Sequence, residues 1–256
     1  MTTVNDILEL METIAPQSLK MEWDNAGLLC GSKTTPVTKV LIALDPYEHV
    51  CREAADWGAE LIVTHHPLIF DPQRSITDDT TVGRNILTLC RNGICAINAH
   101  TNLDQAPGGV NDILAQTLGL HNIQTICENG MQLLRCGDVP EQDLSAFLLT
   151  VKERLNCNGL RYCDTGKKVR KVAVGGGACG SEWQDALRAG CDTFVTADIK
   201  YHEFWDAYIC GLNIIDAGHF STENPVCRYL ADKISEAFPN IEVRISETHA
   251  DCMKYY

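Results

Sequence analysis

The chain has 256 residues, of which 45% are hydrophobic and 21% charged, and its formal net charge is −13. This composition is typical of globular proteins and allows one large or two small domains. The acidic balance argues against nucleic acid as a general partner, because no cluster of Lys and Arg is present to neutralise phosphates.

No run of the sequence reaches the roughly eighteen apolar residues that a membrane-spanning helix requires, so no membrane partner is expected. Residues 1–14 (MTTVNDILELMETI) predict an amphipathic helix rather than a signal peptide. The thirteen cysteines lack CxxC pairing, and we expect most of them to be reduced core residues. Together these features predict a cytoplasmic protein.

Residues 39–64 predict a β-α-β unit. Two short apolar runs, 39–45 (KVLIALD) and 60–64 (ELIVT), are typical of buried strands, and residues 47–57 between them have helical periodicity. The second half of the chain repeats this order, with a strand, a helix and a strand at 171–175, 181–189 and 192–196.

The two units also match residue by residue at one constant spacing. The matched positions are Lys39-Val40 with Lys171-Val172, Gly58 with Gly190, and Val63-Thr64 with Val195-Thr196. Several identities at the same spacing indicate an internal repeat.

A third apolar strand follows each unit, ending at His100 in the first and at His219 in the second. We therefore predict an α/β fold of two similar lobes, residues 1–125 and residues 126–256. A C-terminal helix predicted over residues 223–238 could pack back on the first lobe. Ligand sites in such sheets lie beyond the carboxyl ends of the parallel strands, so we expect the functional residues there.

The strongest local motif is Thr64-His65-His66-Pro67, at the end of a predicted buried strand. Pro67 keeps the residue before it extended. Adjacent strand residues face opposite sides, so both imidazoles can serve one site only if the strand ends there. The alternative is a solvated loop histidine beside a core histidine.

The ends of the third strands carry two further motifs. Each pairs a histidine with a carboxylate four residues later, His100 with Asp104 and His219 with Glu223. A short helical turn would place both members of a pair on one side. Either pair could instead support other ligands or cap a helix.

Taken together, these strand ends present imidazole and carboxylate groups that suit borderline divalent metals such as Zn, Mn, Fe, Co or Ni. Six candidate side chains exceed what one tetrahedral ion needs, so we predict a dinuclear site between the lobes. Cysteine is absent from the motifs, which disfavours a closed structural zinc site.

Six segments resemble the GTP cyclohydrolase 1 type 2 family, which is also called NIF-three-like or YbgI-type. They occur in the family's order and span nearly the whole chain: EWDNAGL at 22–28, THHP at 64–67, NAHTNLDQAPGGVND at 98–112, VGGG at 174–177, TADIKYHE at 196–203 and DAGHFSTE at 216–223. The two lobes are joined by a short tract, so the chain resembles the short form that lacks the family's inserted middle domain.

The resemblance implies that two divalent ions are bound by His65, His66, Asp104, His219 and Glu223, with His100 lining the site. It also implies a ring-shaped homohexamer. The function it implies is metal-dependent hydrolysis of a nucleotide or phosphoester, and the family name narrows this to opening of the guanine imidazole ring of GTP with release of formate. The alternative is a metal-binding, ring-shaped scaffold or regulator without turnover, which would have no open coordination position.

Other motif residues leave alternatives open. Gly175, Gly176 and Gly177 either form a tight turn or contact a substrate phosphate through backbone N–H groups. Asp198 and His202 follow the second strand of the repeat, where His202 is either a general acid or base or a group that supports the ligands.

Overall fold

The computed structural model describes residues 1–128 and 130–256. The chain divides into two compact units, each described here by itself. Unit 1 comprises Met1–Ala106 and Val226–Ala250, and unit 2 comprises Pro107–Pro225 and Asp251–Tyr256. The division after residue 106 differs from the boundary predicted near residue 125, because the helix that follows Pro107 packs in the core of unit 2. No helix of the described ranges has the length and apolar character needed to cross a bilayer.

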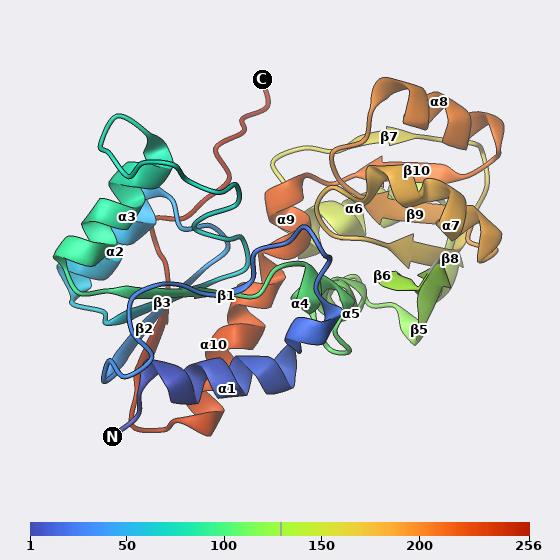
Figure 1. Cartoon of the computed structure of the whole chain (residues 1–256). Helices are drawn as coiled ribbons and strands as arrows, with labels where there is room; N and C mark the ends of the chain where they lie inside the picture. Colours follow the sequence, from blue (N-terminus) through green and yellow to red (C-terminus); the bar gives the residue numbers. More distant parts are fainter. Residues whose placement is uncertain (129) are drawn as a thin grey trace. The chain divides into compact units, whose positions relative to one another are not determined.

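Unit 1 contains one five-stranded sheet of order β1-β4-β3-β2-β11, parallel except for the β1–β4 pair. Its strands are β1 (Gly27–Cys30), β2 (Lys39–Ala43), β3 (Leu61–Thr64), β4 (Cys95–Asn98) and β11 (Glu242–Ile245). Its helices are α1 (Val4–Ile14), η1 (Gln17–Leu19), α2 (Glu48–Trp57), α3 (Thr81–Arg91), α4 (Thr101–Gln105) and α10 (Pro225–Ala237). Helices α2 and α3 cover one face of the sheet, and α1 and α10 lie on the other (Figure 1).

The predicted N-terminal helix is α1, and its start is fixed by a capping box. The Thr3 hydroxyl accepts a hydrogen bond from the amide of Asp6, and the Asp6 carboxylate accepts one from the amide of Thr3. Val4, Ile7 and Met11 form the buried stripe of the helix. The local sequence therefore determines both the start of α1 and the side that it buries.

Unit 2 contains a six-stranded sheet of order β5-β6-β8-β9-β10-β7, in which β8, β9 and β10 are parallel. Its strands are β5 (His121–Glu128), β6 (Met131–Gln142), β7 (Arg161–Cys163), β8 (Val169–Val174), β9 (Thr193–Thr196) and β10 (Asn213–Asp216). Its helices are α5 (Val110–Thr117), α6 (Leu144–Arg154), η2 (Cys179–Glu182), α7 (Trp183–Arg188), α8 (Tyr201–Ile209) and α9 (His219–Glu223). Side chains of α5 and α6 pack on one face of the sheet, and those of α7 and α8 on the other.

The internal repeat extends to the hydrogen-bonded register of the strands. Val40 of β2 pairs with Leu61 of β3, and the corresponding residues Val172 of β8 and Thr193 of β9 pair in the same way. Because both faces of these strands are covered, β3 and β9 are buried at every position. Full burial explains the continuous apolar runs that predicted them.

Equivalent positions of the two third strands, β4 and β10, are separated by fewer residues of sequence than equivalent positions of the first and second strands. Thr64 of β3 pairs with Asn98 of β4, and Thr196 of β9 pairs with Asp216 of β10. Asn98 therefore corresponds to Asp216. The spacing is shorter here because the connection that leads to β10 is shorter than the one that leads to β4.

The short helices α4 and α9 keep the same correspondence, so that His219 corresponds to Thr101 in the repeat and not to His100. The predicted correspondence of His100 with His219 is therefore wrong by one residue. His100 is the N-cap of its helix, whereas His219 is the first helical residue.

Candidate metal centre

His65 and His66 leave the end of β3, the central strand of the unit 1 sheet. The strand ladder ends there, and the two rings lie 4.8 Å apart between centroids. His65 Nδ1 donates to the carbonyl oxygen of Ala99 at 2.9 Å, and His66 Nδ1 is 2.7 Å from Asp45 Oδ1. Each ring is therefore fixed through Nδ1, which leaves Nε2 as the nitrogen suited to bind a metal.

His100 joins these two histidines from the start of α4. Its ring centroid lies 5.3 Å from that of His65 and 5.5 Å from that of His66. The three imidazoles offer ligand nitrogens within 4.8 Å of one another. Asp104 adds a carboxylate, with Oδ1 3.5 Å from His65 Nε2. Unit 1 thus gathers His65, His66, His100 and Asp104.

Two aspartates orient the rings of unit 1, of which Asp24 is buried and Asp45 is half-buried. His100 Nδ1 lies 2.8 Å from Asp24 Oδ1, and Asp24 also accepts hydrogen bonds from the amide and hydroxyl of Thr101. Burial raises the pKa of the Asp24 carboxyl, but the donors from His100 and Thr101 outweigh burial and hold that pKa well below its usual range. The ionised form of Asp24 is therefore favoured, and this carboxylate fixes the ring of His100.

Asp45 has the same role beside His66. It accepts from His66, and its second oxygen lies 3.0 Å from His249 Nε2. Burial raises the pKa of Asp45, yet the hydrogen bonds from His249 and His66 lower it to well below the usual range. Sequence reasoning missed both Asp45 and His249, although Asp45 ends the apolar run predicted as a strand.

In unit 2, the pair His219 and Glu223 forms the first and last residues of α9. Their side chains meet with His219 Nε2 3.0 Å from Glu223 Oε2, while His219 Nδ1 lies 2.8 Å from Asp198 Oδ2. Burial lowers the pKa of His219, but the two carboxylates outweigh burial and raise it to about 10. The two carboxylates therefore favour the protonated form of His219.

Asp198 adopts a left-handed backbone conformation, with φ of +53°, that directs its carboxylate to His219. Asp198, which was predicted to lie near the site, thus orients the ring of His219. His202 lies at the start of α8 with an exposed side chain, and no hydrogen bond or ion pair joins it to other described residues. A role for His202 as general acid or base stays a prediction.

The glycine loop at 175–177 is already bonded within the protein. Gly175 N donates to Val195 O, Gly176 N to Asn111 Oδ1, and Gly177 N to the hydroxyl of Thr222. These three bonds favour the tight turn over the phosphate contact that the sequence also allowed. Gly177 lies against the ligand pair, because a Cβ at this position would be 2.0 Å from Glu223 Oε1.

Comparison with known proteins agrees with the sequence resemblance. A model of the Duf34/NIF3 (NGG1p interacting factor 3) family matches residues 2–252. A Clostridium perfringens protein named GTP cyclohydrolase 1 type 2 homolog is 36% identical over 259 residues, which cover 98% of this chain and 99% of that protein. The crystal structure of a Bacillus cereus protein related to NIF3 matches with a TM-score of 0.94 at 27% identity, covering 100% of this chain and 99% of that one.

A longer relative supports the prediction that this chain is a short form of the family. The Halalkalibacterium halodurans protein of the same name is 45% identical over 360 residues of alignment, covering 96% of each chain. Because this alignment is longer than the 256 residues of the present chain, the relative carries residues that have no counterpart here. The match over residues 2–252 and the near-full-length relatives show that this chain is a short-form member of the Duf34/NIF3 family.

Proposed function

We propose that this protein is a hydrolase that depends on two divalent metal ions, bound by His65, His66, Asp104, His219 and Glu223. The observation that carries the proposal is the way the histidines are held. His66, His100 and His219 each have an aspartate at Nδ1, and His65 has a backbone carbonyl there. Metal-binding histidines characteristically have such a partner, because it fixes the ring orientation and makes the other nitrogen a better ligand.

The chemistry of the donors also fits. Each unit supplies imidazole nitrogen and carboxylate oxygen, the mixed set that suits Zn, Mn, Fe, Co or Ni, and a carboxylate can bridge two ions. When bound, such ions supply Lewis-acid activation of water and of a carbonyl or phosphoryl oxygen. His100 would line the site, and Asp24, Asp45 and Asp198 would keep the rings in place.

For the substrate, we propose a nucleotide or another phosphoester. The support is the name GTP cyclohydrolase 1 type 2 homolog carried by relatives that align over nearly their whole length. Cyclohydrolysis of GTP would open the imidazole ring of guanine and release formate. We further propose a cytoplasmic homohexamer, which light scattering would detect as a mass six times the 28.3 kDa of one chain.

The deciding experiment measures metal per chain in protein purified without chelator, and then assays the metal-loaded form against GTP and a panel of phosphoesters. About two ions per chain and turnover that EDTA abolishes are expected. Two ions without turnover on any compound would favour the scaffold, and protein that binds no divalent ion would overturn the proposal.

A further inference from the structure

Helix α8 of unit 2 carries an aromatic stripe of which only Phe204 packs against the core. Tyr201, Phe204, Trp205 and Tyr208 follow the i, i+3, i+4, i+7 spacing of one helix face. The helix buries Glu203 and Ala207 instead, while Tyr201, Trp205 and Tyr208 stay 80%, 51% and 46% exposed. A contiguous group of exposed large aromatic side chains is typical of a binding surface.

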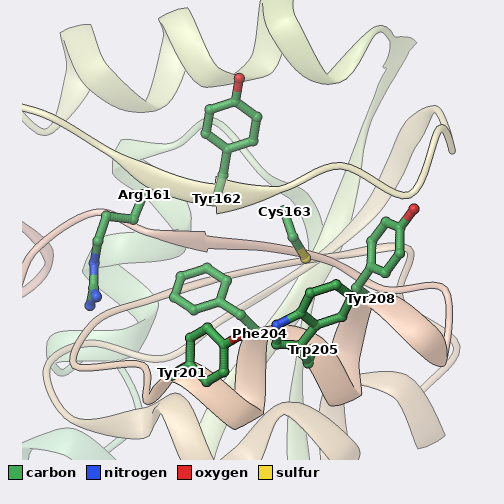
Figure 2. A pocket seen from close by; sticks show the side chains of 7 residues that line it. All are labelled: Arg161, Tyr162, Cys163, Tyr201, Phe204, Trp205 and Tyr208. Carbon is green, nitrogen blue, oxygen red and sulfur yellow. The ribbon is translucent and has the colours of Figure 1, made fainter.

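These rings form one wall of a pocket of about 510 Å³. The opposite wall is β7, the edge strand of the sheet, from which Arg161 and Cys163 point toward α8, whereas the ring of Tyr162 points to the other side (Figure 2). Small-molecule sites typically have this volume and combine a mainly aromatic lining with a few fixed polar groups.

Arg161 is the fixed polar group. Its Nη2 is paired with Asp216 and donates to the carbonyl oxygen of Ile199 at 3.3 Å, and its guanidinium lies 5.5 Å from the centroid of the Phe204 ring. Among the described residues, its Nε and Nη1 groups have no hydrogen-bond partner, and the side chain is 58% exposed. A cationic donor with spare N–H groups is therefore held rigidly beside the aromatic wall.

The two residues that hold Arg161 lie in the segments that also position the candidate ligand His219. Asp216, the partner of Arg161, accepts a hydrogen bond from the amide of Gly218, the residue before His219. Ile199, whose carbonyl accepts from Arg161, follows Asp198, which orients the His219 ring. The pocket thus borders the two loops that carry the unit 2 half of the proposed metal centre.

We propose that this pocket binds a purine base that carries a carbonyl group, such as the guanine of a nucleoside or nucleotide. Bases stack on exposed aromatic rings whatever their identity, and a guanidinium favours the carbonyl oxygen and ring nitrogen of guanine over the amino group of adenine. The proposal deepens the proposed function by giving the nucleotide a base site, and it rests on that function for its natural ligand.

The test uses the full chain treated with EDTA, so that metal cannot contribute, and titrates guanosine, inosine and adenosine by calorimetry. Guanosine and inosine are expected to bind more tightly than adenosine. Trp205→Ala should weaken guanosine binding by about five- to a hundredfold, which corresponds to the loss of one stacking contact. Tyr201→Ala removes an 80% exposed ring and should also weaken binding without endangering the fold.

Ile209→Ala is the matched control, because Ile209 ends the same helix, is 75% exposed and does not line the pocket. No guanosine binding by the wild type, equal binding of adenosine, or unchanged binding in both aromatic variants would overturn the proposal. A change of molecular mass in Trp205→Ala would also overturn it, by showing that the surface contacts another copy of the chain.

Failure of the base site is distinguishable from failure of the hydrolase. Guanosine binding to metal-free protein, without GTP turnover after metal loading, would retain the pocket and remove the enzyme. GTP turnover with an unchanged KM in Trp205→Ala would retain the enzyme and remove the pocket.

Discussion

The two repeats end in different side chains although their strands share one register. In that register, which matches Val40 with Val172, Asp45 corresponds to Gly177 and His66 corresponds to Asp198. In unit 1, the residue at the second position after the strand is an imidazole, and an aspartate that follows the neighbouring strand orients it. In unit 2, that position is itself the aspartate, Asp198, and it orients His219 of α9.

The surroundings of Gly177 explain why unit 2 has a glycine at the position where unit 1 has Asp45. Where unit 1 has the Asp45 side chain, unit 2 has the Glu223 carboxylate, which lies so close to Gly177 that a Cβ has no room. One scaffold therefore supports two ways of fixing a histidine. The lesson is that a repeat preserves the place where ligands gather, but not which strand end supplies the ligand and which supplies its partner.

The largest expected effect comes from removing one ligand of each unit. His65→Ala and Glu223→Gln should each lower metal affinity by more than about 100-fold, since loss of even a supporting partner costs about 10- to 100-fold. Metal content by mass spectrometry after dialysis would measure this. His121→Ala, an exposed residue of β5, is the control that should keep its metal. Wild-type metal content in both ligand variants would contradict the assignment.

Gly177→Ala tests the packing against Glu223. An alanine at the φ of +60° found there costs about 1–3 kcal/mol of stability from backbone strain, and the new Cβ must displace the carboxylate. Gly166→Ala is a matched control, because Gly166 has φ of +76° and open space around it. We expect Gly177→Ala to lose more stability in urea unfolding, and to lose metal, whereas Gly166→Ala retains it. Equal behaviour of the two would refute the contact.

The pH dependence of the metal-free protein tests the ion pairs of His219. The folded-state pKa of about 10 lies above the ordinary value of 6.5, so the protonated form is favoured by folding. This contribution is fully present below pH 6.5 and is lost as the pH rises toward 10. Asp198→Asn should lower the pKa of His219 and flatten this loss. Urea unfolding in EDTA at pH 6 and pH 9 measures it, and an unchanged slope in the variant would count against the pair.

The smallest effect should be shared by both units. Gly58 and Gly190 follow α2 and α7 at equivalent positions of the repeat, with φ of +74° and +75°. A Cβ at Gly58 meets nothing within 4 Å, and one at Gly190 meets only the end of Lys171 at 4.0 Å. Each alanine substitution should therefore cost a similar amount, about 1 kcal/mol, in thermal or urea unfolding. Costs that differ several-fold would show that the repeat is not equivalent at these turns.

Much of the fold could be predicted from sequence because its signals are local. Buried parallel strands give continuous apolar runs, and the constant spacing of the repeat is visible without any structure. The strand ends, and with them His65, His66 and Asp104, follow from these patterns. The match of His100 with His219 failed because the connections before the third strands differ in length. The correspondence beyond these connections is visible only from the hydrogen-bonded pairing of the strands.

The amino-acid sequence by itself determined the strands and helices of the internal repeat, which residue types gather at the strand ends, and the family. Only the tertiary structure decided which partner each ring has. Asp24 meets His100 across 76 residues, Asp45 meets His249 from near the other end of the chain, and β7 meets α8 to form the aromatic pocket. Such pairings depend on sheet order and on the direction of each side chain, which are set by packing and not by local propensity.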